Sequence, residues 1–445
     1  LKTVGCGAFV GLSLLKVIIC RSATPPAWAY GDVFSYDGTA KSTAVGADKR
    51  ILYVPEGSAP EGIASAYRTY KYNDVVGWGD AFGLIYEGES RVVEISSYDD
   101  LVAFRDYVNA GKIGTNEAYG AATSFLLTTD IDLAGKDWKP IGTNKADNII
   151  FDGGGHIIKG MRNATVDGNY VGFFAEIINS TVRNLHFQYP EVSAKNDAGV
   201  VAGKAVNSIF SDILIIGGDN PIVRAASSSS VGGIIGYGSN IELSRCYVEG
   251  KVDSEGGNIG GLVGCMWKGS ITDCIFGWQV SSTKAVPTRV GGIVGTIGKE
   301  DNQDCKVSIN RTVSWAKVSA ASGTGNLAMG GLIGLIDPGN KVDVTNCGWY
   351  NPNSKLSLVG NGTTTDSNCS NYTKRSDMVE SNLVSLLEDG KWDYFYDVEE
   401  HWQNYPIPIS LKEMYMNAYV NLKASDNGLV YQQNSGDIDW ESDLI

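Results

Sequence analysis

The chain has 445 residues, and its 36 lysines and arginines against 50 aspartates and glutamates give a formal net charge of −14. Nucleic acids and anionic membrane surfaces are bound through clustered cations, so this balance argues against both as partners. The 55 glycines and only 12 prolines indicate many tight turns, within a chain long enough for two or three domains.

The first twenty residues, LKTVGCGAFVGLSLLKVIIC, contain an apolar run that no targeting signal explains. A membrane-spanning helix needs about 20 apolar residues, whereas Ser13 and Lys16 interrupt the run from Ala8 to Cys20. A signal peptide carries its cation before the apolar region and ends in a small-residue cleavage site, and neither feature is present. We therefore expect no signal peptide and no membrane insertion in this segment.

The spacing L-x-x-V-G-x-x-A-F-x-G-L-x-x-L-x-x-I-x-C of the same stretch resembles one unit of the BspA-like leucine-rich repeat of bacterial surface proteins. The matching residues are Leu1, Val4, Gly5, Ala8, Phe9, Gly11, Leu15 and Ile18, and ATPPAW (23–28), ILYVPEGS (51–58), Tyr67, Trp78 and Phe82 continue the match. The resemblance implies that residues 1–90 are the C-terminal end of such an array. It also implies that earlier repeats and a signal peptide precede this fragment.

Residues 91–123 are predicted to form a helical connector. Ser97 can cap a helix whose third position is Asp100, which completes a capping-box pattern. Leu101, Phe104 and Val108 then fall on one face, and residues 109–111 supply the stop.

A strand pattern begins at residue 124. SFLLTTDIDLAGKDWKPIG (124–142) alternates at strand period, and FDGGGHIIKGM (151–161) supplies a glycine turn followed by another strand. The carboxylates of Asp130 and Asp132 are able to hold calcium or to cap a turn. We favour the turn, because no aspartate-rich calcium-binding repeat accompanies them.

A second repeat follows. Its glycine segments are VGFFAE, AGVVAG, GGIIG, GGLVG, GGIVG and GGLIG, with the leading motif glycines taken as Gly172, Gly199, Gly233, Gly261, Gly292 and Gly331. A short strand after each segment places Leu185, Ile213, Cys246, Cys274, Thr312 and Cys347 in one column. Neighbouring coils of a solenoid lie only about 4.8 Å apart, so a column of small or apolar residues is expected to face inward. The inward cysteines should then be reduced, although the sequence leaves open a pairing of Cys347 with Cys369.

This G-L-x-G pattern resembles the GLUG motif of bacterial surface proteins and some large secreted peptidases. The resemblance implies a mainly β fold, a right-handed parallel β-helix (solenoid) over residues 124–410, preceded by the leucine-rich remnant and the short helix. KWDYFYDVEEHWQNYPIPI (391–409) resembles the way such domains close. Residues 411–445 are expected to form a cap or tail, either helix or strand.

The residue before the inward column alternates in charge on successive coils. The series is Asn184, Asp212, Arg245, Asp273, Arg311 and Asn346. It predicts either a catalytic groove or a ladder of exposed ion pairs. A glycosidase needs two carboxylates about 5–10 Å apart, but Arg245 lies between the coils of Asp212 and Asp273. We favour the ladder and assign no catalytic residue.

The sequence offers few residues in arrangements that bind a metal or a cofactor. The eight cysteines form no CxxC pair, and the three histidines, His156, His186 and His401, lie far apart in the sequence. We therefore expect neither a metal site nor a cofactor.

Aromatic residues give the candidate ligand-binding site. Trp278, Trp315, Trp349 and Tyr350 follow the second strand of successive coils. Exposed together, they would form a platform on which sugars or peptide side chains stack. The alternative is that they wedge between coils and loops, where solenoids commonly bury large residues.

The leading functional hypothesis is a secreted or surface-displayed bacterial protein for adhesion or recognition, without catalytic activity. Solenoids present long binding faces, and a host protein or a glycan is the expected partner. Two alternatives stand beside it. One is a carbohydrate-active β-helix enzyme, a polysaccharide lyase or glycoside hydrolase, and the other is an inert surface spacer.

Overall fold

The computed structural model describes residues 92–113, 123–163, 169–218, 220–226, 229–255, 257–283, 288–298, 305–321 and 327–374, together with short stretches before residue 54 and between residues 377 and 415. The chain divides into two compact units. One comprises residues 1–94 and 113–126, and the other comprises residues 95–112 and 127–445.

Within the first unit the described strands pair in parallel. β1 (Thr3–Val4) pairs with β3 (Ala27–Trp28), and β2 (Val17–Ile19) pairs with β4 (Ile51–Tyr53). The other residues of the predicted leucine-rich segment, 1–90, lie outside the described part of the chain, so this assignment stays a prediction. The boundaries between the two units fall within β5 (Val92–Ile95) and within β6 (Ser124–Leu127).

The predicted connector helix is confirmed as α2 (Tyr98–Asn109). The Ser97 hydroxyl accepts the Asp100 N–H at 3.1 Å, which satisfies a backbone donor that the first helical turn leaves free. Leu101, Phe104 and Val108 are buried as expected, and the Phe104 ring stacks on Phe151 at 5.7 Å. The helix is therefore fastened to the first coils through one apolar face.

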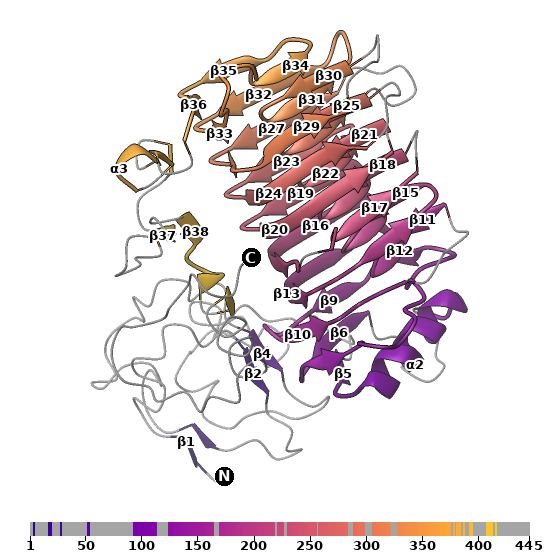
Figure 1. Ribbon diagram of the computed structural model, residues 1–445. Coiled ribbons are helices and arrows are strands. Elements are labelled where there is room, and N and C mark those ends of the chain that lie inside the picture. Colours follow the sequence, from indigo (N-terminus) through magenta and orange to yellow (C-terminus); the bar gives the residue numbers. More distant parts are fainter. Residues whose placement is uncertain are drawn as a thin grey trace. The chain divides into compact units, whose positions relative to one another are not determined.

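The second unit is a parallel β-solenoid, as the sequence predicts, and its coils stack along one axis (Figure 1). Each new coil adds a parallel strand to the same sheets. The strands are β7 (Ile131–Asp132), β8 (Ala146–Asp147), β9 (Ile150–Asp152), β10 (Ile157–Lys159), β11 (Tyr170–Val171), β12 (Phe174–Ile178), β13 (Thr181–Gln188), β14 (Val192–Ala194), β15 (Asp197–Gly199), β16 (Ala202–Ile216), β17 (Val223–Ala225), β18 (Ser229–Gly232), β19 (Ile235–Ser244), β20 (Tyr247–Ser254), β21 (Gly257–Gly260), β22 (Val263–Met266), β23 (Gly269–Thr272), β24 (Ile275–Ser282), β25 (Thr288–Gly291), β26 (Val294–Ile297), β27 (Lys306–Asn310), β28 (Val313–Ser314), β29 (Lys317–Ala320), β30 (Leu327–Gly330), β31 (Ile333–Ile336), β32 (Lys341–Thr345), β33 (Gly348–Tyr350), β34 (Val359–Asn361), β35 (Thr365–Ser367) and β36 (Ser370–Tyr372).

The repeated glycines lie where backbones of one coil and the next approach most closely. A Cβ on Gly261 would lie 2.1 Å from the carbonyl oxygen of Gly292 and 2.5 Å from the Phe276 ring. Such distances are too short for any side chain, so the motif is needed for close approach. The predicted series is wrong by one position, because Gly199 pairs with Gly232 rather than with Gly233.

The predicted inward column is confirmed. Leu185, Ile213, Cys246, Cys274, Thr312 and Cys347 are all 0% exposed. The preceding residues form a corner of left-handed backbone, with φ of 50° at Asn184, 54° at Asp212, 53° at Arg245, 55° at Asp273, 45° at Arg311 and 55° at Asn346.

The corner also explains why small donors follow it. The Cys274 thiol donates to the Thr272 carbonyl at 3.2 Å, and the Thr312 hydroxyl donates to the Asn310 carbonyl at 3.0 Å. Each donor thus binds the carbonyl two residues back, across the left-handed residue, where a buried acceptor would otherwise cost free energy.

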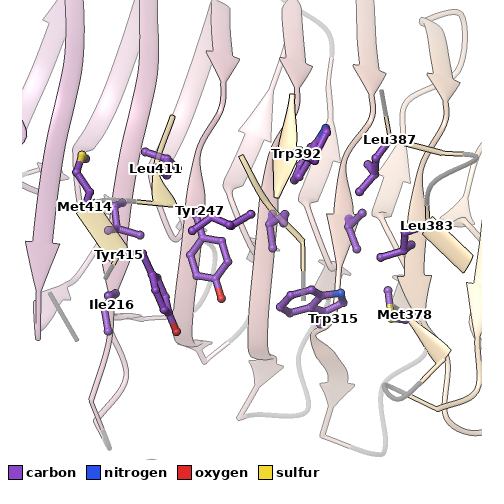
Figure 2. Packing of buried hydrophobic residues seen from close by; sticks show 14 of the residues in the cluster. Ile216, Tyr247, Trp315, Met378, Leu383, Leu387, Trp392, Leu411, Met414 and Tyr415 are labelled. Atoms are coloured by element: carbon purple, nitrogen blue, oxygen red, sulfur yellow. The ribbon is translucent and has the colours of Figure 1, made fainter. Parts of the chain in front are cut away.

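The coils end at Tyr372, and the later segment packs on an outer face of the solenoid. It contains α3 (Glu380–Leu383) and the antiparallel strands β37 (Trp392–Tyr394) and β38 (Pro406–Pro408). Figure 2 shows the resulting apolar cluster, which joins outward side chains of the coils to this segment. Its members are Leu214, Ile216, Tyr247, Ile275, Val313 and Trp315 from the coils, and Met378, Leu383, Leu386, Leu387, Trp392, Ile407, Leu411, Met414 and Tyr415.

The predicted range 124–410 therefore contains both the coils and a segment that covers them. Among the residues that the structure describes, no helix has the length and apolar character needed to cross a bilayer.

Candidate functional site

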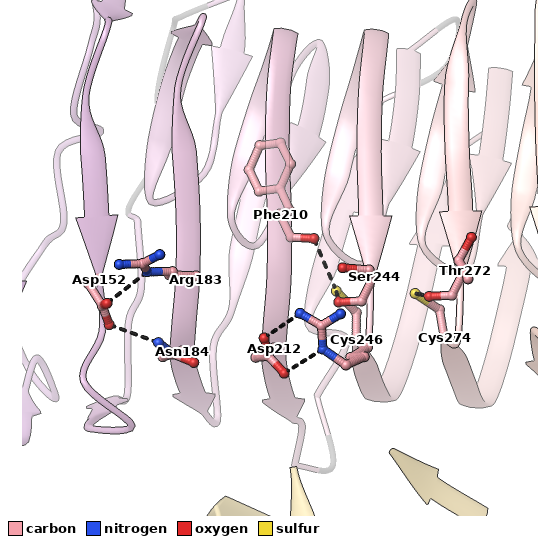
Figure 3. A network of polar contacts seen from close by, with 10 residues as sticks. Asp152, Arg183, Asn184, Phe210, Asp212, Ser244, Cys246, Thr272 and Cys274 are labelled. Carbon is pink, nitrogen blue, oxygen red and sulfur yellow. Dashed lines mark hydrogen bonds and ion pairs between the residues drawn. The ribbon is translucent and has the colours of Figure 1, made fainter. Parts of the chain in front are cut away.

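The alternating charged column forms ion pairs between neighbouring coils. Arg245 donates from Nε and Nη2 to the two carboxylate oxygens of Asp212, at 2.9 and 2.8 Å. Arg311 binds Asp273 in the same way, at 2.6 and 2.9 Å. Figure 3 shows the Asp212 contact and, two coils earlier, Asp152 accepting from Arg183 at 2.8 Å. The predicted ion pairs are confirmed at Asp212–Arg245 and Asp273–Arg311, but the prediction that they are exposed is wrong for the two carboxylates, which are buried.

The local electrostatics favour the ladder as a structural element. Asp212 and Asp273 are 6% and 7% exposed, so each carboxylate is nearly shielded from water. Burial alone would lower the pKa of the Arg245 guanidinium, but the hydrogen bonds and charge of Asp212 outweigh burial and raise it. Bidentate pairing engages the oxygens that a catalytic acid or nucleophile would have to offer to a substrate.

The aspartates of the opening strands make turn contacts. Asp132 Oδ1 accepts the N–H of Ala134 at 2.8 Å. Asp130 Oδ1 accepts the N–H of Ile157 at 3.0 Å and lies 3.1 Å from His156 Nδ1. The His156 contact holds the pKa of Asp130 below its usual value. Among the described residues no group of three or more His, Cys, Asp or Glu side chains has a metal-binding arrangement.

The predicted row of exposed aromatic residues is not formed. Trp315 is 6% exposed inside the cluster under the C-terminal segment, and Trp349 is 7% exposed. The Trp349 ring occupies the space that glycine leaves at Gly331, and its Nε1 donates to the Leu356 carbonyl at 3.2 Å. Tyr350 is partly buried and packs against the apolar cluster that contains Trp315. The wedge interpretation therefore describes Trp315 and Trp349, and ligand binding by these residues stays a prediction.

Trp278 differs from the other two tryptophans because it reaches the surface. It lies in β24 with a φ of 96°, in the region that side chains rarely adopt. In the preceding coil its register partner is Gly250. The Lys251 ammonium lies 5.2 Å from the centre of the indole ring, within cation–π range.

Polar residues occupy the strand position next to this tryptophan. Lys251, Gln279 and Lys317 occupy one position on three successive coils. Lys317 is exposed, and within the described residues no ion pair involves it. We call Trp278 with Lys251, Gln279 and Lys317 the Trp278 platform.

The residues two positions further along these strands point to the same face and are also polar. Arg224, Asp253, Ser281 and Ser319 follow one another there on successive coils. The Ser281 hydroxyl donates to Asp253 and accepts a hydrogen bond from Gln279 Nε2 at 3.1 Å. The Lys251 ammonium thus lies over the indole ring, and Gln279 follows Trp278 directly in the strand, so a cation and an amide accompany the aromatic ring, which is chemistry suited to polar ligands with an apolar face.

Sequence reasoning selected Trp278 but missed what distinguishes it. The signal was an alignment of two coils, in which CYVEG (246–250) and CIFGW (274–278) place a tryptophan opposite a glycine. That exchange suggests an aromatic ring held in a backbone conformation suited to glycine.

Comparison with known proteins relates the chain by fold. No family model matches it. Halomucin of Haloquadratum walsbyi is 28% identical over 188 residues, which cover 38% of this chain, and the chain spans only 2% of that protein's length. A Bacteroides ovatus protein with the provisional name immunoglobulin A1 protease, solved at 1.30 Å, aligns with a TM-score of 0.51 and 20% identity over 73% of this chain and 94% of that one. The chain is thus similar in fold to the Bacteroides ovatus protein and, over part of its length, in sequence to halomucin.

Proposed function

We propose that the chain is a recognition protein without catalytic activity, and that it binds glycans through the Trp278 platform. The observation that carries the proposal is the backbone of Trp278, whose φ of 96° belongs to a glycine-type conformation. A strained residue of this kind costs about 1–3 kcal/mol and tends to be kept where it serves a function. A tryptophan that is only partly buried gains less packing free energy to offset this backbone strain, so packing alone does not explain it.

The chemistry of the platform favours a carbohydrate. The faces of sugar rings carry C–H groups that stack on an indole, while their hydroxyls need donors and acceptors at the rim. The Gln279 amide supplies both kinds of group, and Lys251 and Lys317 add cations. On a chain of net charge −14, two lysines beside an aromatic ring also favour glycans that carry a carboxylate or sulfate.

The proposed location is outside the cell or on its surface. It rests on the resemblance of residues 1–90 to BspA-like repeats and of the coils to GLUG segments, both found in bacterial surface proteins. Halomucin and the provisionally named immunoglobulin A1 protease are consistent with this location by their names.

The experiment is a glycan array probed with the full chain and two matched variants. Trp278→Ala should weaken retention about 2- to 12-fold, the equivalent of 0.5–1.5 kcal/mol for one stacked ring, while the circular dichroism spectrum stays native. Lys317→Gln should weaken retention of anionic glycans more than that of neutral ones. Lys306→Gln, which removes an exposed lysine on β27 outside the platform, serves as the charge-matched control.

Other outcomes favour the other two hypotheses. Retention unaffected by Trp278→Ala would contradict the platform. Absence of any retained glycan would favour the spacer, and polysaccharide cleavage that disappears with Asp212→Asn would favour the enzyme.

A further inference from the structure

Two cysteines stack on each other at the last coils of the solenoid. Gly348 pairs with Ser370, and the Ser370 N–H donates to the Cys347 carbonyl at 2.9 Å, so Cys347 and Cys369 occupy the same position on adjacent coils. Adjacent strands lie about 4.8 Å apart, and disulfides form between Cα atoms about 4.4–6.8 Å apart. The register therefore meets the main geometric condition for a disulfide.

The two side chains are also oriented alike. Each thiol donates to the carbonyl two residues back, Cys347 to Thr345 at 3.1 Å and Cys369 to Ser367 at 3.4 Å. The two thiols also lie within hydrogen-bonding reach of each other across the two coils. Both are free thiols in the structure.

Cys347 and Cys369 differ in solvent exposure and in the pKa of the thiol. Cys347 is 0% exposed, and burial raises the pKa of its thiol. Cys369 is partly exposed, and a hydrogen bond from Cys347 lowers the pKa of its thiol to about 7. The thiolate is the reactive form of cysteine, so Cys369 is the sulfur that an oxidant would meet first.

We propose that Cys347 and Cys369 form an oxidisable pair, which closes a disulfide between the last two coils when a low-molecular-weight disulfide such as oxidised glutathione is present. In the first step the Cys369 thiolate attacks that disulfide, and one glutathione thiolate leaves. Cys347 then attacks the Cys369 sulfur, and the second glutathione leaves as a thiol that carries away the Cys347 proton. The two cysteine sulfurs are oxidised by two electrons, which reduce one glutathione disulfide to two thiols.

The bond would fasten a weakly held coil. No residue of β34 or β35 is buried, whereas β31, on which β34 stacks, is mostly buried and β32, on which β35 stacks, buries Val342 and Val344. Asp366 takes the position that Val344 occupies one coil earlier, so apolar packing is reduced there. A covalent link at Cys369 supplies what the packing lacks.

The chain contains its own control. Cys246 and Cys274 are stacked in the same register three coils earlier, since Tyr247 pairs with Ile275. Both are 0% exposed, and burial raises the pKa of the Cys274 thiol. Cys246 and Cys274 therefore have the same spacing as Cys347 and Cys369, but both are shielded from an oxidant.

The test treats the full chain with oxidised glutathione at pH 8 and maps its peptides by mass spectrometry without reduction. We expect a linked peptide pair containing Cys347 and Cys369, lighter by two hydrogens, while Cys246 and Cys274 remain free thiols. Cys347→Ser should stop at a stable glutathione adduct on Cys369, and Cys274→Ser should leave the linkage unchanged. Amide hydrogen exchange in β34 to β36 should slow at least several-fold after oxidation.

Three results would overturn the proposal. They are a glutathione adduct on Cys369 that never resolves in the unaltered chain, linkage of Cys246 to Cys274 at an equal rate, and no reaction at Cys369.

Discussion

Arg245 holds both carboxylate oxygens of Asp212 across one coil of the solenoid, at 2.9 and 2.8 Å. Both residues also have left-handed backbone, with φ of 53° and 54°. The ladder therefore combines two tasks at one corner, because it turns the chain and ties each coil to the next. The same pairing recurs at Asp273 and Arg311, whereas Asn184 and Asn346 adopt the left-handed backbone at the same corner without a charge.

Removing one charge of this pair should destabilise the solenoid. Asp212→Asn keeps the left-handed backbone, which Asn tolerates, but loses a charged acceptor beside a partly buried guanidinium. We expect the free energy of unfolding to fall by about 1–3 kcal/mol in urea titrations. The control is Glu176→Gln, which breaks the more exposed pair with Lys204 and should cost less than about 1 kcal/mol. Equal losses would show that burial of the ladder has no energetic weight.

The repeated glycines should not tolerate even a methyl group. In Gly261→Ala the new Cβ would meet the Gly292 carbonyl oxygen at 2.1 Å, so we expect a loss of about 3 kcal/mol or more. Gly277 is the matched control on the same coil region, since a Cβ there has 3.6 Å to its nearest neighbour, Trp315. Gly277→Ala should be neutral or stabilise by up to about 1 kcal/mol. Thermal unfolding of the two variants would contradict this assignment if their order were reversed.

The fold was predictable because the solenoid repeats its constraints. Each coil must stack on the next, so Cys246, Cys274 and Cys347 recur at one position of the sequence as they do in space. The glycine motif recurs for the same reason, although its register between Gly199 and Gly233 was misjudged by one residue. Periodicity identifies a repeat more reliably than it aligns the members of that repeat.

The candidate site was predictable only in part, because exposure depends on contacts distant in sequence. Trp315 and Trp278 occupy similar positions in their repeats, yet the segment from Met378 onward covers only Trp315. No sequence pattern near either tryptophan predicts which of the two the C-terminal segment covers. The positive φ of Trp278 was also hidden, since sequence statistics assign such backbone to glycine and asparagine.

The stability of the solenoid should depend on the protonation of His186. This side chain is 0% exposed, neither ring nitrogen has a partner among the described residues, and burial lowers its pKa to about 3. The unfolded chain takes up a proton below its ordinary pKa of about 6.5, whereas the folded chain does not until about 3. Stability is therefore fully present above pH 6.5 and is lost as the pH falls, by up to about 1.4 kcal/mol per unit.

His186→Leu isolates this contribution, because Leu214 already occupies the same position on the next coil. Between pH 7 and pH 5 the unaltered chain should lose about 2 kcal/mol more than the variant in urea titrations. The nearby charge of Asp130 acts in the opposite direction and reduces the difference. Parallel pH profiles for the two chains would show that His186 is accessible to protons in the folded state.

The last prediction separates strain from packing at the Trp278 platform. Alanine in place of Trp278 would keep a side chain at a φ of 96°, whereas glycine would relax it, as Gly250 does on the preceding coil. Glycine normally lowers stability relative to alanine, but here Trp278→Gly should be more stable than Trp278→Ala by about 1–2 kcal/mol. Both variants should lose glycan retention equally, since both lack the ring that stacks. Trp315→Ala provides the contrast, because truncation of a buried tryptophan costs about 3–5 kcal/mol and leaves the platform itself untouched. If alanine at position 278 proved more stable than glycine, the backbone there would be unstrained, and the platform would lose the observation on which its function rests.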